Sequence, residues 1–397
     1  MALRHQVNDA IEATLRFSRQ FDRYYRDTFD ALLRGPIVAV TQLLINATRA
    51  KDNLAIAEER LLDDEEALGR DITQHMCEFL KAHYTGGVAL RAGNTKTHGL
   101  LRARLEVLPD LPPSLARGIF AEPRVYKAWV RVAGPGPLAP PDLDDNGILS
   151  LSVKVMGVDG EKLLDDERGT QDFTAISAPT FTTPDARENL KLQKHIGDGT
   201  PSLYFMNFTD SHLLDAIMQG MFARAVGNPL DLTYWSCVPY LHGEGQAVKY
   251  QFRPRELQRT EIPRQPGPVY LREAMAATLV EKDVIFDMLV QFQTDPRSMP
   301  IENASVIWSS PFQPVARLHI PPQRFDSPAQ MSFDRNLSFN PWHAIAAHRP
   351  LGNQNRVRRR IYHDTSVFRQ AMNHAARIEP TGDEVFPALS IMEAHTR

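Results

Sequence analysis

The chain has 397 residues and a formal net charge of −3, with 43% apolar and 23% charged residues. This composition is ordinary for a globular protein and excludes a disordered chain, a collagen and a polytopic membrane protein. Cys77 and Cys237 are the only cysteines, which excludes a disulfide scaffold and a cysteine-rich zinc module.

The N-terminal part predicts helices. Apolar residues recur at three- and four-residue spacing over residues 1–85, and residues 1–70 are expected to form a helical extension. The longest early apolar run, residues 37–45, is short, whereas a membrane-spanning helix needs about 20 residues. We therefore expect a cytoplasmic protein. The apolar faces of these helices are compatible with homo-oligomerisation or with peripheral contact to a membrane.

The middle of the chain predicts β-structure. Short β-rich segments separated by Pro, Gly and Asp occupy residues 88–183 and 232–321, and one of these predicted strands is 305–310. Helical patterns occupy residues 185–227 and 341–378. Because strands and helices do not alternate strictly, we predict an α+β fold built on an antiparallel sheet or barrel.

The densest chemical signal is a basic stretch near the C-terminus, RVRRRIY at residues 356–362. The acidic balance of the whole chain argues against nucleic acid as its partner. Arg358 and Tyr362 are four residues apart and share one face of a helix. A guanidinium beside a phenol favours the phenolate, and tyrosine is the iron ligand in one class of haem enzymes. This spacing alone is common by chance.

Several further motifs accompany this pair in chain order. They are THG at 97–99, GIFAEP at 118–123, AWVR at 128–131, QFQTD at 291–295, MPIE at 299–302, LSFNPW at 337–342 and HRPLGN at 348–353. Together they resemble the catalase superfamily, specifically its small bacterial haem proteins, such as mini-catalases and allene oxide synthase-like proteins. The resemblance implies a catalase-like antiparallel β-barrel with flanking helices over residues 71–378, followed by a tail at 379–397. The C-terminal helical domain of catalases is lacking.

The resemblance also implies haem b as the cofactor, with ferric iron on an axial tyrosine. By position, Tyr362 would be the iron ligand and Arg358 would hold it as phenolate. Arg369 and Arg131 occupy positions where catalases bind the haem propionates.

On the other side of the haem, the resemblance implies that His98 is the acid–base group that moves a proton between the two peroxide oxygens. Phe120 and Phe181 would be apolar residues of the haem pocket. Thr97 precedes His98, as in allene oxide synthases, where catalases usually have an apolar residue. Ser177 is the nearest polar residue to the position where catalases carry an asparagine.

These departures bear on the substrate. The absent asparagine would orient hydrogen peroxide, whereas an organic hydroperoxide is positioned by its own apolar chain. A propionate-binding arginine of catalases is also replaced, by Thr95. We therefore expect a haem enzyme that converts organic hydroperoxides, in particular those of fatty acids, by isomerisation, dehydration or peroxidase chemistry. The alternatives are a mini-catalase or peroxidase that acts on hydrogen peroxide and a haem-binding or haem-sensing protein without turnover.

Overall fold

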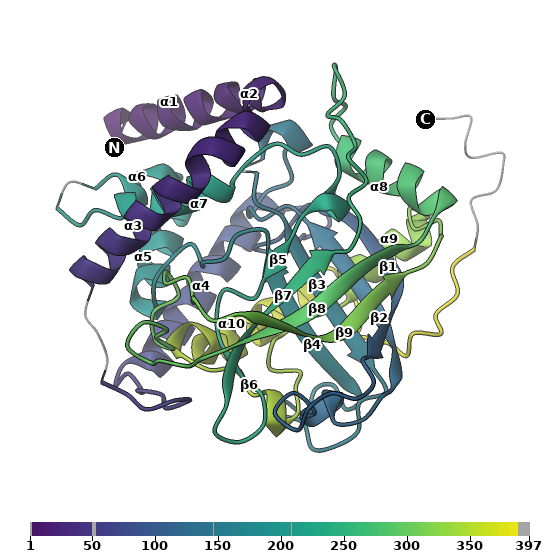
Figure 1. The fold of residues 1–397 in the computed structure, drawn as a ribbon. Helices are drawn as coiled ribbons and strands as arrows, with labels where there is room; N and C mark the ends of the chain where they lie inside the picture. Colours follow the sequence, from purple (N-terminus) through teal and green to yellow (C-terminus); the bar gives the residue numbers. More distant parts are fainter. Residues whose placement is uncertain (1, 50–52, 146, 208, 388–397) are drawn as a thin grey trace.

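The computed structural model describes residues 2–49, 53–145, 147–207 and 209–387. In this part of the chain, one antiparallel sheet curls into a barrel with helices packed around it (Figure 1). The strand order is β5-β4-β3-β2-β1-β9-β8-β7-β6, and pairing of β5 with β7 closes an eight-stranded ring. The predicted antiparallel barrel is therefore confirmed.

Most strands lie close to the predicted β-rich segments. The strands are β1 (Thr97–Val107), β2 (Val125–Ala133), β3 (Ser150–Met156), β4 (Thr170–Ile176), β5 (Tyr234–Trp235), β6 (Tyr240–Leu241), β7 (Ala247–Pro254), β8 (Val284–Phe292) and β9 (Phe312–Ile320). Few residue pairs close the barrel. Strand β4 pairs with β5 only through Ile176 and Trp235, and β5 pairs with β7 through two residue pairs.

Both faces of several strands are covered by other parts of the protein. Every residue of β3 is buried, although its sequence SLSVKVM alternates between polar and apolar residues, because the polar side chains on its outer face are covered as well. Inward side chains such as Val153 belong to the barrel core. On the outer face, Trp129 of β2 packs against Phe333, with ring centres 5.6 Å apart.

Helices precede, interrupt and follow the barrel strands. The helices are α1 (Ala2–Arg19), α2 (Asp22–Phe29), α3 (Gly35–Thr48), α4 (Glu65–His83), α5 (Ala186–Gly197), α6 (Pro201–Phe205), α7 (Leu213–Phe222), α8 (Tyr270–Glu281), α9 (Pro328–Asn336) and α10 (Asn353–Met372). The sequence patterns do not predict α8 and α9. A π-helical turn, η1 (Asp30–Arg34), joins α2 to α3.

The start of α10 is fixed by its neighbours. Gly352 has a φ of +85°, and a side chain there would bring a Cβ within 2.6 Å of the Ile301 carbonyl oxygen. Only glycine fits this position without strain. Asn353 then donates from Nδ2 to Glu302 Oε2 at 2.9 Å, and Arg356 also pairs with Glu302. These contacts set where the residues of α10 lie against the barrel.

The predicted strand at 305–310 is wrong. Its residues are largely buried, but side chains pair with their backbone in place of a neighbouring strand. Lys249 Nζ donates to the Val306 carbonyl at 2.9 Å, and Gln291 Nε2 donates to the Trp308 carbonyl at 2.9 Å. An apolar run alone does not distinguish a strand from such a buried irregular segment.

The expectation that the early apolar run is too short to span a membrane is also wrong. Residues 22–48 form one helix of 27 residues, whose most apolar window has a mean hydropathy of 1.3. By length and composition this helix could cross a bilayer, and only 17% of that window is buried. The apolar run at residues 37–45 is only part of this helix, which continues for several turns before it.

Candidate functional site

Arg358 and Tyr362 lie together on α10. Arg358 donates to the Tyr362 hydroxyl at 2.8 Å, and its guanidinium carbon lies 4.8 Å from the centre of the phenol ring. Arg358 also donates to Asn355 Oδ1 at 3.0 Å and to Thr174 Oγ1 at 3.1 Å. Burial lowers the pKa of Arg358, but Tyr362, Tyr240 and Tyr250 together outweigh burial, and the pKa lies above its usual value. A fixed cation is therefore held against the phenol oxygen.

Apolar side chains surround this pair. Tyr362 packs against a cluster from α4, α5 and α10, made up of Leu68, Ile72, Ala186, Leu190, Val357 and Ile361. Phe181 has its ring centre 5.8 Å from the Arg358 guanidinium carbon. Phe120 belongs to a different ring cluster, with its ring centre 5.3 Å from that of His348 and 6.3 Å from that of Phe173. The structure thus places Phe181, and not Phe120, beside Arg358.

Three arginines gather around one carboxylate, that of Asp334 on α9; Arg131 and Arg369 are buried and Arg91 is half-buried. Arg131 Nε lies 2.9 Å from Asp334 Oδ1, and Arg91 lies 3.6 Å from Oδ2. Arg369, two turns beyond Tyr362 on α10, donates to the Leu337 carbonyl at 3.1 Å, just after α9. Burial raises the pKa of Asp334, but the three arginines lower it below its usual value. Positive charge exceeds negative charge in this arginine cluster, which suits a ligand with carboxylate groups.

Arg91 is a site residue that the sequence comparison misses. Catalases place the corresponding arginine where this chain has Thr95, and Arg91 lies four residues earlier in an irregular segment. Thr95 Oγ1 donates to the Arg91 carbonyl at 2.6 Å, which bends this segment. Arg91 then donates to the carbonyls of Asp334 and Leu337 at 2.7 and 2.8 Å. The only feature of the sequence that marks Arg91 is that it is the one charged residue among residues 84–95.

His98 lies at the start of β1 and is 1% exposed. Its Nδ1 lies 3.6 Å from Asp142 Oδ1, and its Nε2 has no hydrogen-bond partner in the described part of the chain. Burial lowers the pKa of His98 to about 3, and the positive charges of Lys96 and Arg272 add to this effect. Arg131 acts in the same direction, which links His98 to the arginine cluster. His98 is therefore neutral near pH 7 and able to accept a proton.

Backbone contacts hold the other two predicted distal residues. Arg272 donates to the Thr97 carbonyl at 2.7 Å. Ser177 Oγ accepts a hydrogen bond from the Leu149 amide at 2.9 Å, and the Ser177 amide donates to the Leu149 carbonyl at 2.8 Å. Leu149 and His98 both line a cavity of about 10 Å³, which is room for about one water molecule. Ser177 thus lies behind the wall of the space beside His98.

The chemistry of these side chains fits a haem group. A tyrosine backed by Arg358 is an oxygen ligand for ferric iron, and the excess of guanidiniums matches two propionates. The free Nε2 of His98 supplies a proton acceptor. The cavity beside His98 is much smaller than a macrocycle, and neither Tyr362 nor Arg131 nor Arg369 lines it. The fit is therefore one of donor groups and charge, and not of preformed space.

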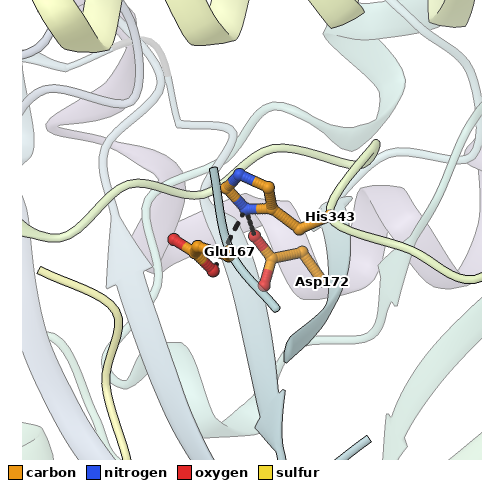
Figure 2. Close-up of side chains that lie close together, drawn as sticks. All are labelled: Glu167, Asp172 and His343. Atoms are coloured by element: carbon orange, nitrogen blue, oxygen red, sulfur yellow. Dashed lines mark hydrogen bonds and ion pairs between the residues drawn. The ribbon is translucent and has the colours of Figure 1, made fainter. Parts of the chain in front are cut away.

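A separate buried cluster carries side chains of the metal-ligating kind. Glu167, Asp172 and His343 bring their ligand atoms within 4.8 Å of one another (Figure 2). His343 Nδ1 lies 2.8 Å from Asp172 Oδ2. Lys154 Nζ lies 2.8 Å from Asp172 Oδ1 and also contacts Glu167 directly. The Lys154 ammonium takes the position of a cation among these oxygens, so we interpret this Lys154 cluster as a structural ion network.

Two of the four arginines of the predicted basic stretch have acidic partners. Arg356 pairs with Glu59, Glu65 and Glu302, and Arg360 pairs with Glu66. These contacts tie α10 to the segment that precedes and begins α4. Arg356 and Arg360 of the basic stretch therefore form ion pairs within the protein.

Comparison with known proteins finds likeness only in structure. No sequence-family profile and no curated protein matches the chain. A bacterial catalase matches with 15% identity and a TM-score of 0.54, covering 85% of this chain and 70% of that one. A fungal catalase matches with 12% identity and a TM-score of 0.56, covering 83% and 70%. Catalase A from Saccharomyces cerevisiae matches with 12% identity and a TM-score of 0.50, covering 81% and 67%.

These likenesses establish the fold. The chain has the catalase fold, an eight-stranded antiparallel barrel with flanking helices, as the sequence motifs predict. It corresponds to about 70% of the length of the first two catalases. The identities of 12–15% carry no residue roles, so the assignments of His98, Tyr362 and the arginines stay predictions.

Proposed function

We propose that this chain, which has the catalase fold, is a haem-dependent enzyme that acts on hydroperoxides. The observation that carries the proposal is the hydrogen bond between Arg358 and Tyr362, on the same helix that brings Arg369 to the arginine cluster. When bound, haem b supplies a ferric ion that can cleave the oxygen–oxygen bond of a peroxide. Tyr362 is the residue that would hold that ion.

The protein's own residues would hold the cofactor by charge. Arg358 donates to the Tyr362 oxygen and would stabilise it as an anionic iron ligand. Arg91, Arg131 and Arg369 would bind the two propionates, whose negative charges balance the surplus of guanidiniums in the arginine cluster.

His98 would carry the proton. Its Nε2 would accept a proton from one peroxide oxygen and return it to the other, which then leaves as water or an alcohol. A pKa of about 3 keeps the ring neutral, so it is ready to accept. Asp142, 3.6 Å from Nδ1, lies on the opposite side of the ring.

We further propose that the substrate is an organic hydroperoxide, in particular that of a fatty acid. Ser177 Oγ already accepts a hydrogen bond from the Leu149 amide, and no side-chain amide stands in its position to orient hydrogen peroxide. The cavity beside His98 has apolar residues such as Val226 and Leu271 in its lining, which suit an acyl chain. Isomerisation and dehydration of the hydroperoxide would need no outside reductant, whereas peroxidase chemistry would need an electron donor.

One observation favours hydrogen peroxide as a second candidate. The cavity beside His98 measures about 10 Å³, which is room for about one water molecule, so hydrogen peroxide would displace its walls far less than a fatty-acid hydroperoxide. A fatty-acid hydroperoxide needs those walls to open.

The test uses the haem-reconstituted protein. We expect a ferric tyrosinate-type spectrum, loss of the conjugated-diene absorbance of a fatty-acid hydroperoxide, and little oxygen evolution from hydrogen peroxide. His98→Gln should retain haem and lose about 10²–10⁴-fold in turnover, as expected for a positioned proton-transfer group. His319→Gln, a half-buried histidine paired with Glu106 at the barrel surface, is the matched control.

Tyr362→Phe should bind much less haem, because the anionic ligand is removed. Rapid oxygen evolution without action on the lipid hydroperoxide would replace the first candidate by the second. A haem spectrum with no turnover of either substrate would show a haem-binding protein without catalysis.

A further inference from the structure

Two kinds of structure form the walls of the cavity beside His98. Leu149 and Val226 line the cavity and belong to the apolar core of the barrel. Arg19, the last residue of α1, and Arg224 line it as well. Because the cavity measures about 10 Å³, a molecule larger than water reaches His98 only if one of these walls moves.

Polar contacts attach helices α1 and α2 to the rest of the protein. We name residues 2–29, which include both helices, the N-terminal cover. Its buried residues are Asn8, Asp22 and Arg26, and none of its residues belongs to an apolar cluster of the described chain. Asn8 Oδ1, for example, accepts from the Ser202 amide at 3.0 Å. Water can replace such bonds when they break, so the cover costs less free energy to detach than the barrel core costs to open.

The contacts of α2 hold the cover against the cavity wall. Arg26 donates to two carbonyls at the end of α7, at 3.0 and 2.8 Å. Asp22 Oδ2 accepts from the amide of Ala225, a residue of the cavity lining, at 2.8 Å. Arg224, which precedes it in the lining, pairs with Asp27 of the cover at 2.6 Å. The cover is thus joined directly to the part of the wall that Arg224 and Ala225 form.

A π-helical turn separates the cover from a helix that is docked on the core. The turn η1 (Asp30–Arg34) is followed by Gly35 and Pro36, and Pro36 has no amide hydrogen for a helical bond. No atom lies within 4 Å of where a Cβ on Gly35 would stand. Helices bend at π-turns, glycines and prolines. In α3, by contrast, Ile45 is fully buried in an apolar cluster with Met218.

We propose that the N-terminal cover is a lid over the cavity beside His98. The lid bends at residues 30–36 and separates from Arg224 and Ala225, while α3 stays docked. Figure 1 shows α1 and α2 at the edge of the molecule, outside the barrel. The inference does not rest on the proposed chemistry of His98, because the entry of a small reagent into the haem-free protein tests it.

The experiment measures how fast diethyl pyrocarbonate, which acylates unprotonated imidazole, modifies His98 in the full chain without haem. Mass spectrometry follows each histidine separately. His348 is the internal reference, because it is 3% exposed, burial lowers its pKa to about 3 as well, and it does not line the cavity. We expect His98 to react faster than His348 and with a weaker dependence on urea, since lid opening exposes less surface than unfolding.

A first variant weakens the closed lid without changing the cavity lining. Arg26→Met removes the bonds to the two carbonyls of α7 and should speed the reaction of His98 about tenfold or more, because a charged donor is lost. Arg16→Met breaks an exposed pair with Glu12 within α1 and is the matched control. Far-UV circular dichroism checks that each variant is folded.

A second variant stiffens the bend and should act in the opposite direction. Gly35 has a helical φ of −56°, so alanine fits there and should slow the reaction of His98 about two- to fivefold. Gly197→Ala, at the end of α5, also has open space around the new Cβ and is the matched control.

The inference is overturned if His98 and His348 react at the same rate and with the same urea dependence, because global unfolding alone would then expose both. It is also overturned if Arg26→Met reacts like Arg16→Met, or if Gly35→Ala reacts like Gly197→Ala. Those outcomes would show that the reagent reaches His98 through another wall of the cavity.

Discussion

The two buried charge clusters of this protein differ in their balance. In the Lys154 cluster, one ammonium lies between the carboxylates of Glu167 and Asp172. In the arginine cluster, three guanidiniums surround the single carboxylate of Asp334. The Lys154 cluster therefore has a carboxylate partner for its cation, whereas the arginine cluster has more positive than negative charge.

The histidines beside the two clusters respond in opposite ways. Burial lowers the pKa of His343, but the carboxylates of Asp172 and Asp166 overcome this effect and raise it above its usual value. Burial lowers the pKa of His98 to about 3, and the cations around it lower it further. The comparison teaches that a buried charge cluster can stabilise the fold where its charges balance. Where they do not balance, the surplus charge is available to bind a ligand.

The largest expected effect is on stability. Lys154→Met leaves the carboxylates of Glu167 and Asp172 buried without their cation, and should reduce the free energy of unfolding by about 3–5 kcal/mol in urea denaturation. Lys127→Met, on the neighbouring strand β2, breaks an exposed pair with Asp383 and should cost no more than about 1 kcal/mol. Equal losses in the two variants would show that the Lys154 cluster is not a structural network.

Removal of a cation from the arginine cluster should act on ligand binding. Arg91→Gln should weaken haem binding by about tenfold or more in a titration followed by absorbance, because a charged hydrogen bond to a propionate is lost. The apoprotein should lose less stability than with Lys154→Met, since the substitution also relieves repulsion from Arg131. Arg104→Gln, at an exposed position on β1, is the control. Unchanged haem affinity in Arg91→Gln would remove this residue from the site.

The pH dependence of turnover should reflect the low pKa of His98. An ordinary histidine is protonated below about pH 6.5 and could not accept a proton at about pH 5. With a pKa of about 3, His98 stays neutral there, so kcat/KM should not fall between about pH 7 and 5. An acid limb near pH 6.5 that disappears in His98→Gln would contradict the burial of this ring.

The histidines His343 and His98 should give opposite changes in stability. Because the pKa of His343 is raised in the folded state, its contribution is complete below about pH 6.5 and is lost as the pH rises through the folded value. For His98 the folded pKa is lowered, so stability should fall as the pH drops from about 6.5 toward 3. Urea denaturation of His343→Gln and His98→Gln across this range separates the two slopes.

Much of the fold could be predicted from the sequence, because barrel strands carry local patterns. The segments that became β1 to β4 alternate with Pro, Gly and Asp punctuation, and the ordered motifs around Tyr362 pointed to one family. Helix α9 was missed, although Ser327 caps it and Pro328 occupies its first turn, which is a readable signal. Helix α8 begins without a side-chain cap and has no comparable mark.

The candidate site is harder to predict where it depends on contacts between residues that are far apart in the sequence. The pairing of Arg358 with Tyr362 lies within one helical turn, so spacing was enough to propose it. Arg91 reaches Asp334 only because a bent segment before β1 lies beside α9, more than 240 residues later in the chain. No local pattern encodes that approach, and the position-by-position comparison led to Thr95.

The narrow closure of the barrel has a consequence for its internal motions. A single residue pair joins β4 to β5, and two pairs join β5 to β7, whereas β2 and β3 pair along their length. Amide protons at this seam, such as those of Tyr234 and Trp235, should exchange with solvent deuterium sooner than those of Val130 and Val153, because fewer bonds must break at once. Since Ser177 directly follows the last residue of β4, each opening of the seam would loosen the wall beside His98. The line of fewest hydrogen bonds in the barrel thus ends next to Ser177, whose partner Leu149 lines the cavity beside His98.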